Sequence, residues 1–141
     1  MPKVGNDDSH VIIEVRSPGS AQVLFSQTVD TSIDGQYSNV ILSGISPGVY
    51  DLIAKGYSHL RRKKSNITLS SGENILDFTD AGLNKLLCGD VNEDNKVNAI
   101  DVTIIVKSLF VSEERTDLNQ DSLVNAIDIT NMVVNFNKVG D

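Results

Sequence analysis

The sequence has no tryptophan, a single cysteine and few aromatic side chains. Aromatic residues make up 5% of the 141 residues, so any packed core is filled mainly by Val, Ile and Leu. Because Cys88 stands alone, the chain can form neither an internal disulfide nor a Cys-x-x-Cys metal or redox motif. We expect Cys88 to be a buried or half-buried thiol.

Long apolar runs are missing as well. No stretch approaches the roughly 18 apolar residues of a membrane span, so we expect no membrane insertion. The opening residues MPKVGNDDSH are polar and do not have the pattern of a secretory signal. A hydrophobic content of 40% nevertheless favours packed cores over disorder.

Positive charge is scarce in the C-terminal part. Residues 1–87 carry nine acidic and eight basic side chains, whereas residues 88–141 carry ten and four, so most of the net charge of −7 lies in the second segment. Such a segment repels phosphates and attracts cations, which argues against a nucleic-acid partner. His10 and His59 belong to no catalytic motif, so we expect surface or turn positions for both and no enzymatic activity.

Short strands separated by turn signals are predicted between residues 11 and 78. The candidates are VIIEV (11–15), QVLFSQTV (22–29), YSNVILSGI (37–45), VYDLIAKG (49–56), NITL (66–69) and ILDF (75–78). This spacing favours a small all-β sandwich. The segment SPGVYDLIAKGYSHL, Ser46–Leu60, also resembles carboxypeptidase-regulatory-like β-sandwich modules, which implies a structural spacer. The basic run Arg61–Lys64 is interpreted as a solvated strand edge.

An acidic dodecapeptide occurs twice in the second segment. DVNEDNKVNAID begins at Asp90 and DLNQDSLVNAID at Asp117, and residues 90–103 and 117–130 agree at nine of fourteen positions. Each copy has oxygen-bearing side chains at loop positions 1, 3, 5, 9 and 12 and offers a main-chain carbonyl at position 7, as in a calcium loop. The predicted ligands of two Ca²⁺ ions are the side chains of Asp90, Asn92, Asp94, Asn98, Asp101, Asp117, Asn119, Asp121, Asn125 and Asp128, with the carbonyls of Lys96 and Leu123.

Two positions depart from the generic calcium loop, which has Gly at position 6 and Glu at position 12. Position 6 is Asn95 in the first copy and Ser122 in the second, and Ser takes the left-handed conformation less readily than Asn. Position 12 is Asp in both copies. We therefore expect the second loop to have the less favourable geometry.

An apolar helical stripe follows each loop, and we expect the two stripes to form the shared core of two helices. At loop position 8, Val97 and Val124 are expected to pair the loops or to seat them on that core. The stripe residues, at matching positions in the two copies, are Val102, Ile105, Val106 and Leu109, then Ile129, Met132, Val133 and Phe136.

Two tandem D-x-N-x-D-x-x-V-N-x-x-D loops, each followed by a single helix, resemble a dockerin, the calcium-dependent module by which cellulosomal and other surface proteins bind a cohesin. The resemblance covers about Cys88 to Lys138. It implies a cohesin domain of a scaffoldin or surface protein as the partner, an extracellular or cell-surface location, and a chain that is monomeric when unbound. The expected fold class is an N-terminal all-β sandwich followed by a small all-α dockerin with two calcium loop-helix repeats.

The expected domain organisation is a flexible tail at 1–9, a β-sandwich spacer at 10–80, a linker at 81–87 and a dockerin at 88–141. Because both copies contain VNAID, we expect a near twofold axis and two alternative orientations of the partner. The partner-binding residues implied by the resemblance are Ala99, Ile100, Val106, Lys107, Ala126, Ile127, Val133 and Val134.

Two other functions stay open at the level of the sequence. The loops could staple a small structural domain of a surface protein that has no cohesin partner, since a segment of this size has little core. A calcium-sensing switch is less well supported, because sensors expose a Met-rich groove and this chain has two Met residues.

Overall fold

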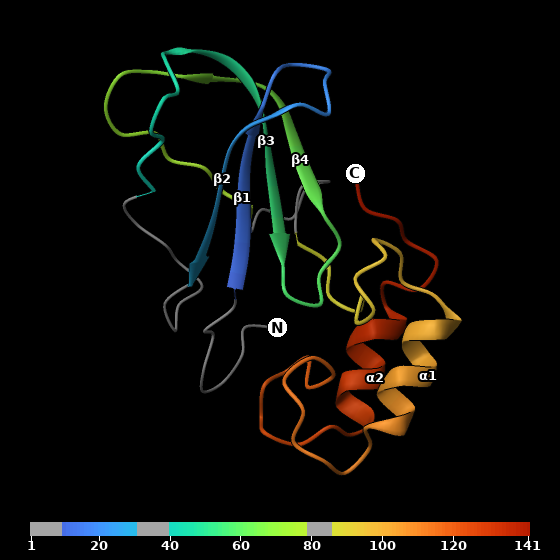
Figure 1. The fold of residues 1–141 in the computed structure, drawn as a ribbon. Helices are drawn as coiled ribbons and strands as arrows, with labels where there is room; N and C mark the ends of the chain where they lie inside the picture. The colour runs from blue at the N-terminus through green and yellow to red at the C-terminus, as the bar shows by residue number, and fades with distance from the viewer. Residues whose placement is uncertain (1–9, 31–39, 79–85) are drawn as a thin grey trace.

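The computed structural model describes residues 10–30, 40–78 and 86–141, which contain one β-sheet and two short α-helices (Figure 1). Neither of these helices is long and apolar enough to cross a membrane. The strands are β1 (His10–Arg16), β2 (Val23–Asp30), β3 (Gly48–Gly56) and β4 (Arg62–Leu69). The helices are α1 (Ala99–Lys107) and α2 (Ala126–Val133).

The four strands form one antiparallel sheet in the order β2-β1-β3-β4. β1 pairs with β2 and β3, and β3 also pairs with β4. The predicted strands at 11–15, 49–56 and 66–69 fall within β1, β3 and β4, and the one at 22–29 overlaps β2 from residue 23 on. Val15 and Leu52 face each other across β1 and β3 and are at most 1% exposed, so the core of the sheet is centred on these two inner strands.

The predicted fold class, an all-β sandwich followed by a small all-α dockerin, is wrong. The described residues form a single sheet, and the predicted strands at 40–45 and 75–78 are irregular. Gly44, at φ 80°, lies in a turn that interrupts the first, and the Asn74 side chain closes a turn with Ser70 just before the second. These irregular segments cover the sheet in place of a second layer of strands, through Val40, Leu42, Ile45 and Phe78.

Part of the predicted organisation lies outside the described residues. This applies to the expected tail at 1–9, to residues 37–39 of the third predicted strand, and to most of the expected linker at 81–87.

The C-terminal part consists mostly of loops, which is why it is not all-α. One helix follows each acidic loop, with nine residues in α1 and eight in α2. Each helix begins with a capping box formed by an Asn and an Asp of the loop, namely Asn98 with Asp101 and Asn125 with Asp128. The loop residues therefore fix where each helix starts.

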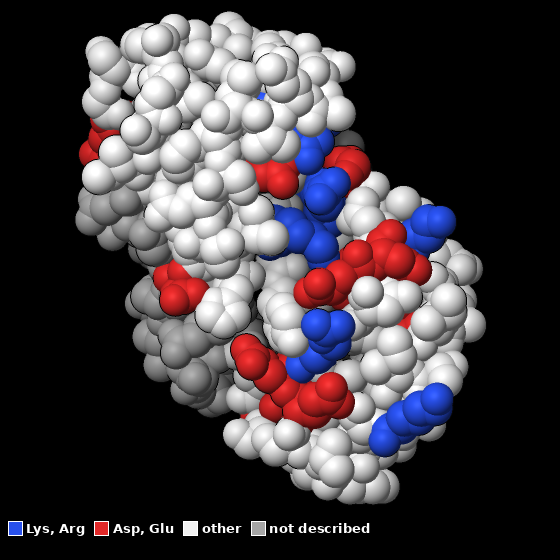
Figure 2. Space-filling model, viewed as in Figure 1, with Lys and Arg blue, Asp and Glu red and all other residues white. Residues whose placement is uncertain are grey.

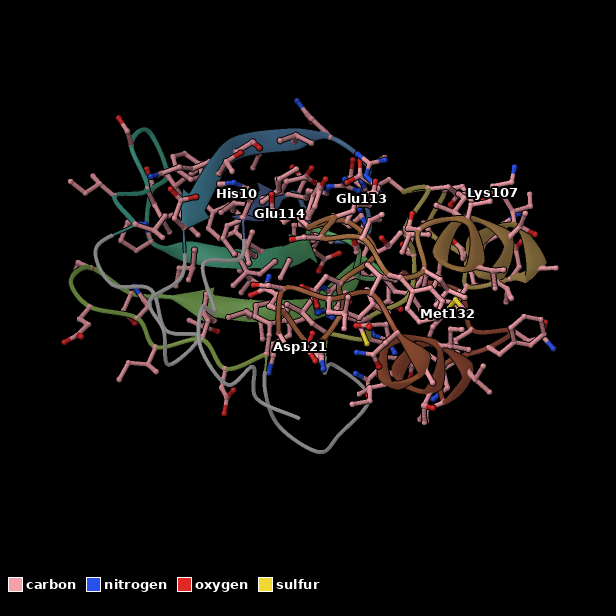
Figure 3. The ribbon with its side chains drawn as sticks, turned by 90° about the horizontal axis from the view of Figure 1, so that it is seen from below. His10, Lys107, Glu113, Glu114, Asp121 and Met132 are labelled. Carbon is pink, nitrogen blue, oxygen red and sulfur yellow. The ribbon has the colours of Figure 1, made fainter. Side chains whose placement is uncertain are left out.

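The buried side of the two helices is narrower than the sequence predicts. Ile105 and Met132 have no exposed surface, and Figure 3 places Met132 between the ribbons of α1 and α2. Val102, Leu109 and Ile129 are half-buried against the same core. The remaining members of the predicted stripes are exposed on the outside of the helices, namely Val106, Val133 and Phe136.

The β3–β4 turn belongs to the core of the loop-helix part. Figure 1 shows this turn pointing toward the helices, and its Leu60 is 0% exposed. Leu60 N–H donates to Leu87 O at 2.8 Å, and Gly89 N–H donates to Ser58 O at 2.8 Å. The same buried cluster contains Leu60, Val91, Val97, Ile105, Val124 and Met132. The two valines at loop position 8 thus belong to this core. Cys88 is half-buried, as expected.

The end of the chain is also fixed against the sheet. Asp141 N–H donates to Arg61 O at 3.0 Å, and Gly140 N–H donates to Asn95 O at 3.0 Å. A Cβ atom at Gly140 would lie 2.0 Å from Asn95 Oδ1 and 2.8 Å from Arg61 N, so the close approach requires glycine here. The first acidic loop, β4 and the C-terminus therefore form one packed junction.

Basic residues of the Arg61–Lys64 run line this junction. Figure 2 shows Lys and Arg side chains gathered between the two parts of the molecule, beside Asp and Glu. Arg61 and Arg62 are half-buried, and Arg62 Nη1 lies 3.8 Å from Asp141 Oδ2. Lys63 is exposed. The interpretation of the whole run as a solvated edge is therefore wrong for the two arginines and for Lys64, which is half-buried with its Nζ over the Phe78 ring.

Candidate metal loops and partner face

The last Asp of each acidic loop ties the loop to its own helix. Asp101 accepts the main-chain N–H of Asn92 at 3.3 Å and of Asn98 at 2.8 Å. Asp128 accepts the N–H groups at the same two loop positions of the second copy, at 3.1 and 2.8 Å. Both carboxylates are 0% exposed. Position 12 therefore lies inside each loop, where its oxygens face other loop atoms.

Positions 3 and 5 lie side by side in both loops. Asn92 Nδ2 donates to Asp94 Oδ2 at 3.0 Å, and Asn119 Nδ2 donates to Asp121 Oδ2 at 2.8 Å. The other oxygen of each Asp accepts the main-chain N–H of position 7, at 2.9 and 3.0 Å. The structure thus brings together the side chains that the sequence predicts as ligands at these positions.

Position 6 adopts the left-handed conformation in both copies. Asn95 has φ 65° and Ser122 has φ 72°. The N–H of each donates to the Asp at position 1, from Asn95 to Asp90 at 3.1 Å and from Ser122 to Asp117 at 2.8 Å. These hydrogen bonds help offset the strain of a left-handed residue other than glycine. The expected difference in backbone geometry between the two loops is therefore not observed.

Asp90 provides the clearest test of whether the first loop suits a cation. Its Oδ2 accepts the N–H of Asn95, whereas its Oδ1 is buried and has no hydrogen-bond partner. An orphaned buried carboxylate oxygen is costly, and a cation is one way to satisfy it. The ligands predicted for this loop are all oxygen atoms, as calcium prefers.

No group of three or more His, Cys, Asp or Glu side chains that could hold a metal ion is found in residues 10–30, 40–78 and 86–141. Amide and main-chain oxygens would therefore have to complete each site beside the carboxylates. Such mixed oxygen sets are usual for calcium. We conclude that the residues present fit a calcium ion.

The Asn at position 9 has a role that the ligand pattern does not predict. Asn98 Oδ1 accepts the N–H of Ile100 at 2.8 Å, and Asn125 Oδ1 accepts the N–H of Ile127 at 2.8 Å. Each Asn is thus the N-cap of its helix. The signal was present in the sequence, since Asn-x-x-Asp before an apolar stripe has the spacing of a capping box.

The carboxylates at position 1 are electrostatically unfavourable without a cation. Burial raises the pKa of Asp90 and the Asp101 carboxylate raises it further, against the lowering effects of Lys55 and the Asn95 N–H. Burial also raises the pKa of Asp117, to which Asp128 adds, against the Ser122 N–H. A divalent cation in either loop would favour the ionised form of these groups.

The metal-free protein should therefore become more stable as the pH falls from neutrality toward the ordinary carboxyl pKa of 3.8. A carboxyl group whose pKa is raised by folding contributes stability below its unfolded pKa and loses it as the pH rises through the folded pKa. In metal-stripped buffer we expect the Tm to rise as the pH is lowered toward 3.8. In excess calcium we expect it to fall over the same interval, because protons compete with the ion.

Scanning calorimetry of metal-stripped and calcium-loaded protein tests this pH dependence. Asp51 acts in the opposite sense, because the N–H groups of Asn66 and Gly19 lower its pKa. Its contribution is lost only below 3.8, outside the range of interest. A metal-free Tm that drops steadily as the pH is lowered over this interval would contradict the prediction.

The two loops differ in their surroundings. Asp90 is 0% exposed and lies against β3, where Lys55 Nζ is 3.0 Å from its Oδ2. Asp117 instead lines a polar groove of about 580 Å³, beside the first residue of β1 and the last residue of β2. His10 and Glu114, both labelled in Figure 3, line this groove. The other residues along it are Asp30, Ser112, Gln120 and Ser122.

The eight residues predicted to bind a partner are all exposed, at Ala99, Ile100, Val106, Lys107, Ala126, Ile127, Val133 and Val134. Equivalent positions have similar exposure: 56% for Ile100 and 50% for Ile127, then 48% for Val106 and 52% for Val133. Main-chain pairing repeats as well, since Phe110 N–H donates to Val124 O at 2.9 Å and Asn137 N–H donates to Val97 O at 2.8 Å. The two loop-helix units are therefore near copies.

Phe110 is a candidate functional residue that sequence reasoning missed. It has φ 66° and is 79% exposed, a left-handed conformation that is unusual for a bulky side chain. Its counterpart in the second unit is Asn137, at φ 64°, and Asn tolerates this conformation well. The difference between Phe and Asn at equivalent positions was the available signal. At this position only the first unit has a large apolar side chain.

The fold and the site define a tandem loop-helix module whose core includes a turn of an antiparallel sheet. Residues 88–137 match the family model of the dockerin type I domain. A search of curated proteins gave no match. The resemblance of Ser46–Leu60 to carboxypeptidase-regulatory-like modules is not confirmed, since the reported family match covers residues 88–137.

Two solved structures share the fold of nearly the whole chain. They are crystal structures of an N-terminal and a C-terminal interface mutant of a type II cohesin-X-dockerin complex from Acetivibrio cellulolyticus. The first aligns with a TM-score of 0.66 and 17% identity over 99% of this chain and 90% of that chain. The second has a TM-score of 0.65 and 16% identity with the same coverage. The similarity extends across both the sheet and the loop-helix part.

Proposed function

We propose that the chain binds two calcium ions through its acidic loops and then docks a cohesin domain through the outer faces of α1 and α2. The observation that carries the proposal is the duplicated loop-helix unit with matched exposed apolar residues, within the segment that matches the dockerin type I model. The matched solved structures, which contain cohesin-X-dockerin complexes, add support. The proposed location is extracellular or at a cell surface.

Each ion would be held by the loop side chains and the position-7 carbonyl. A bound ion supplies positive charge that offsets the carboxylates and fixes the loop. In the first loop, Asp90 Oδ1 has no other partner and is directly available. Asn98 and Asn125 are occupied as helix caps, so each offers at most the second lone pair of its side-chain oxygen.

The loops would in turn position the partner face. Ala99–Ile100 and Ala126–Ile127 are the first residues of α1 and α2, immediately after the N-caps. An ordered loop therefore determines where each exposed Ile is presented. Small and branched apolar residues suit a buried contact in which a few side chains supply most of the affinity.

The sheet would have a structural role, in which it packs against this module and contributes to its core. We place the boundary between residues 78 and 88, with the sheet before it and the dockerin-like segment after it. The turn residue Leu60 supports this role, because it lies in the core of the loop-helix part. The proposed function assigns no catalysis to either part.

Isothermal titration of the full chain should show two calcium ions bound. Asp94→Ala should remove binding at the first loop and Asp121→Ala at the second, because each change deletes a predicted carboxylate ligand. Glu93→Ala is a matched control, since this exposed acidic neighbour occupies a position that does not ligate. One ion per chain, or loss of calcium binding in the control, would contradict the assignment.

The calcium-loaded chain can then be tested by surface plasmon resonance against a panel of cohesin domains, with chelator as the matched blank. We expect specific cohesin binding in the presence of calcium and none in chelator. If the chain binds two ions but no cohesin of the panel, the result favours a structural domain stapled by calcium.

A further inference from the structure

Lys55 belongs to β3, yet its ammonium group lies in the first acidic loop. Its Nζ is 3.0 Å from Asp90 Oδ2 and also donates to the carbonyl of His59. The Lys55 side chain is 13% exposed and that of Asp90 is 0% exposed. This ion pair is therefore nearly removed from water, where the attraction of opposite charges is strongest.

The ion pair leaves the other oxygen of the same carboxylate free. Oδ2 of Asp90 accepts from both Lys55 and the Asn95 N–H, while Oδ1 is buried without a hydrogen-bond partner. Lys55 thus does not block the oxygen that a cation would use. It places a fixed positive charge beside the carboxylate to which a cation would bind.

The second loop is built differently at the same position. Asp117 accepts main-chain N–H groups, from Asp121 at 3.2 Å and from Ser122 at 2.8 Å. It lines the polar groove, whose lining residues include no lysine or arginine. Two loops that share eight of their twelve residues therefore have different electrostatic surroundings, and the difference comes from outside the repeat.

We propose that Lys55 is an internal counter-ion of the first loop, which stabilises this loop without metal and lowers its affinity for calcium relative to the second loop. The inference rests on the calcium binding proposed above. Without an ion, the ammonium offsets the cost of burying Asp90. With an ion, the same ammonium repels a divalent charge. Both effects weaken binding, so the second loop fills first as calcium rises.

The test compares Lys55→Met, which keeps most of the apolar stem and removes the charge, with Lys55→Arg, which keeps the charge. Lys63→Met is the matched control, because this exposed lysine comes from the neighbouring strand β4. Calcium is titrated into each full-length variant in chelator-buffered solutions. The amide signals of Asn95 and Ser122 are followed by NMR, since each donates to the position-1 carboxylate of its own loop.

In the wild-type chain, the Ser122 signal should change at lower free calcium than the Asn95 signal. Lys55→Met should lower the Asn95 midpoint by about tenfold, as expected for removing a nearby buried charge, and leave the Ser122 midpoint in place. Lys55→Arg and Lys63→Met should retain the wild-type order. An unchanged or higher Asn95 midpoint in Lys55→Met, or an equal shift at both loops, would overturn the inference.

Thermal unfolding gives a second, independent readout. Lys55→Met should lower the Tm in chelator more than in saturating calcium, because tighter binding stabilises the folded state. An equal drop in both conditions would identify Lys55 as an ordinary packing residue and overturn the inference. If the wild-type chain binds no calcium at either loop, the proposed function itself fails, which is a different outcome from any of these.

Discussion

Replacing Ile100 and Ile127 together by Asp should abolish cohesin binding, whereas either single replacement should leave most of it. Ile100 and Ile127 occupy equivalent, exposed positions at the starts of α1 and α2. If the partner can bind in two orientations related by about 180°, each single variant keeps one intact face. The double variant would bury an unpaired charge in both orientations and should lose at least about a hundredfold in affinity.

The single variants need not be equal, because the two units differ beside their faces. Phe110 adds a largely exposed aromatic ring next to the end of α1, and its counterpart is Asn137. We expect Ile100→Asp to weaken binding more than Ile127→Asp, which should have an effect of at most about twofold. Phe110→Asn makes the first unit resemble the second and should reduce the difference between the single variants.

Surface plasmon resonance in excess calcium measures all four variants against one cohesin. Leu24→Asp is the matched control, since it introduces the same charge at a 41% exposed apolar residue of β2. If one single change removes nearly all affinity and the other removes none, only one face binds. The repeated NAID would then serve folding and helix capping.

The acidic loops and their helices could be predicted because their determinants are local. Asp and Asn residues at fixed spacing bond to main-chain groups a few positions away, as Asp101 does with Asn98. The strand positions were also recognisable from alternation and turn residues. The arrangement of the strands was not, since residues 40–45 and 75–78 look like strands yet cover the sheet as irregular chain.

The contacts between the sheet and the loop-helix part produce no periodic pattern in the sequence. Lys55 and Asp90 are 35 positions apart, and a lysine within VYDLIAKG reads as an ordinary exposed strand residue. The basic run after it has the pattern of a solvated edge for the same reason. In the structure, however, the main-chain N–H of Arg61 donates to Asn95 Oδ1 at 2.7 Å. Long-range pairs of this kind depend on the tertiary fold and cannot be inferred from spacing.

Leu60→Ala should destabilise the loop-helix part, although residue 60 lies far before the segment that matches the dockerin type I model. Leu60 is 0% exposed and packs with Ile105 and Met132 in one core. Truncating a fully buried Leu leaves a cavity and should lower the free energy of unfolding by about 3 kcal/mol. Because calcium binding and folding are linked, apparent calcium affinity should fall as well.

Urea unfolding in calcium and in chelator measures the change, and hydrogen exchange at the Ile105 and Met132 amides locates it. Leu24→Ala is a surface control with little expected effect, while Leu69→Ala removes a side chain that is 3% exposed in the core of the sheet. We expect Leu60→Ala to reduce protection in both helices, and Leu69→Ala to act first on the strands. Full protection of both helix amides in Leu60→Ala would show that the turn is dispensable. The observed result would then favour two independent modules, with the main-chain hydrogen bonds of Ser58 and Arg61 sufficient to dock them.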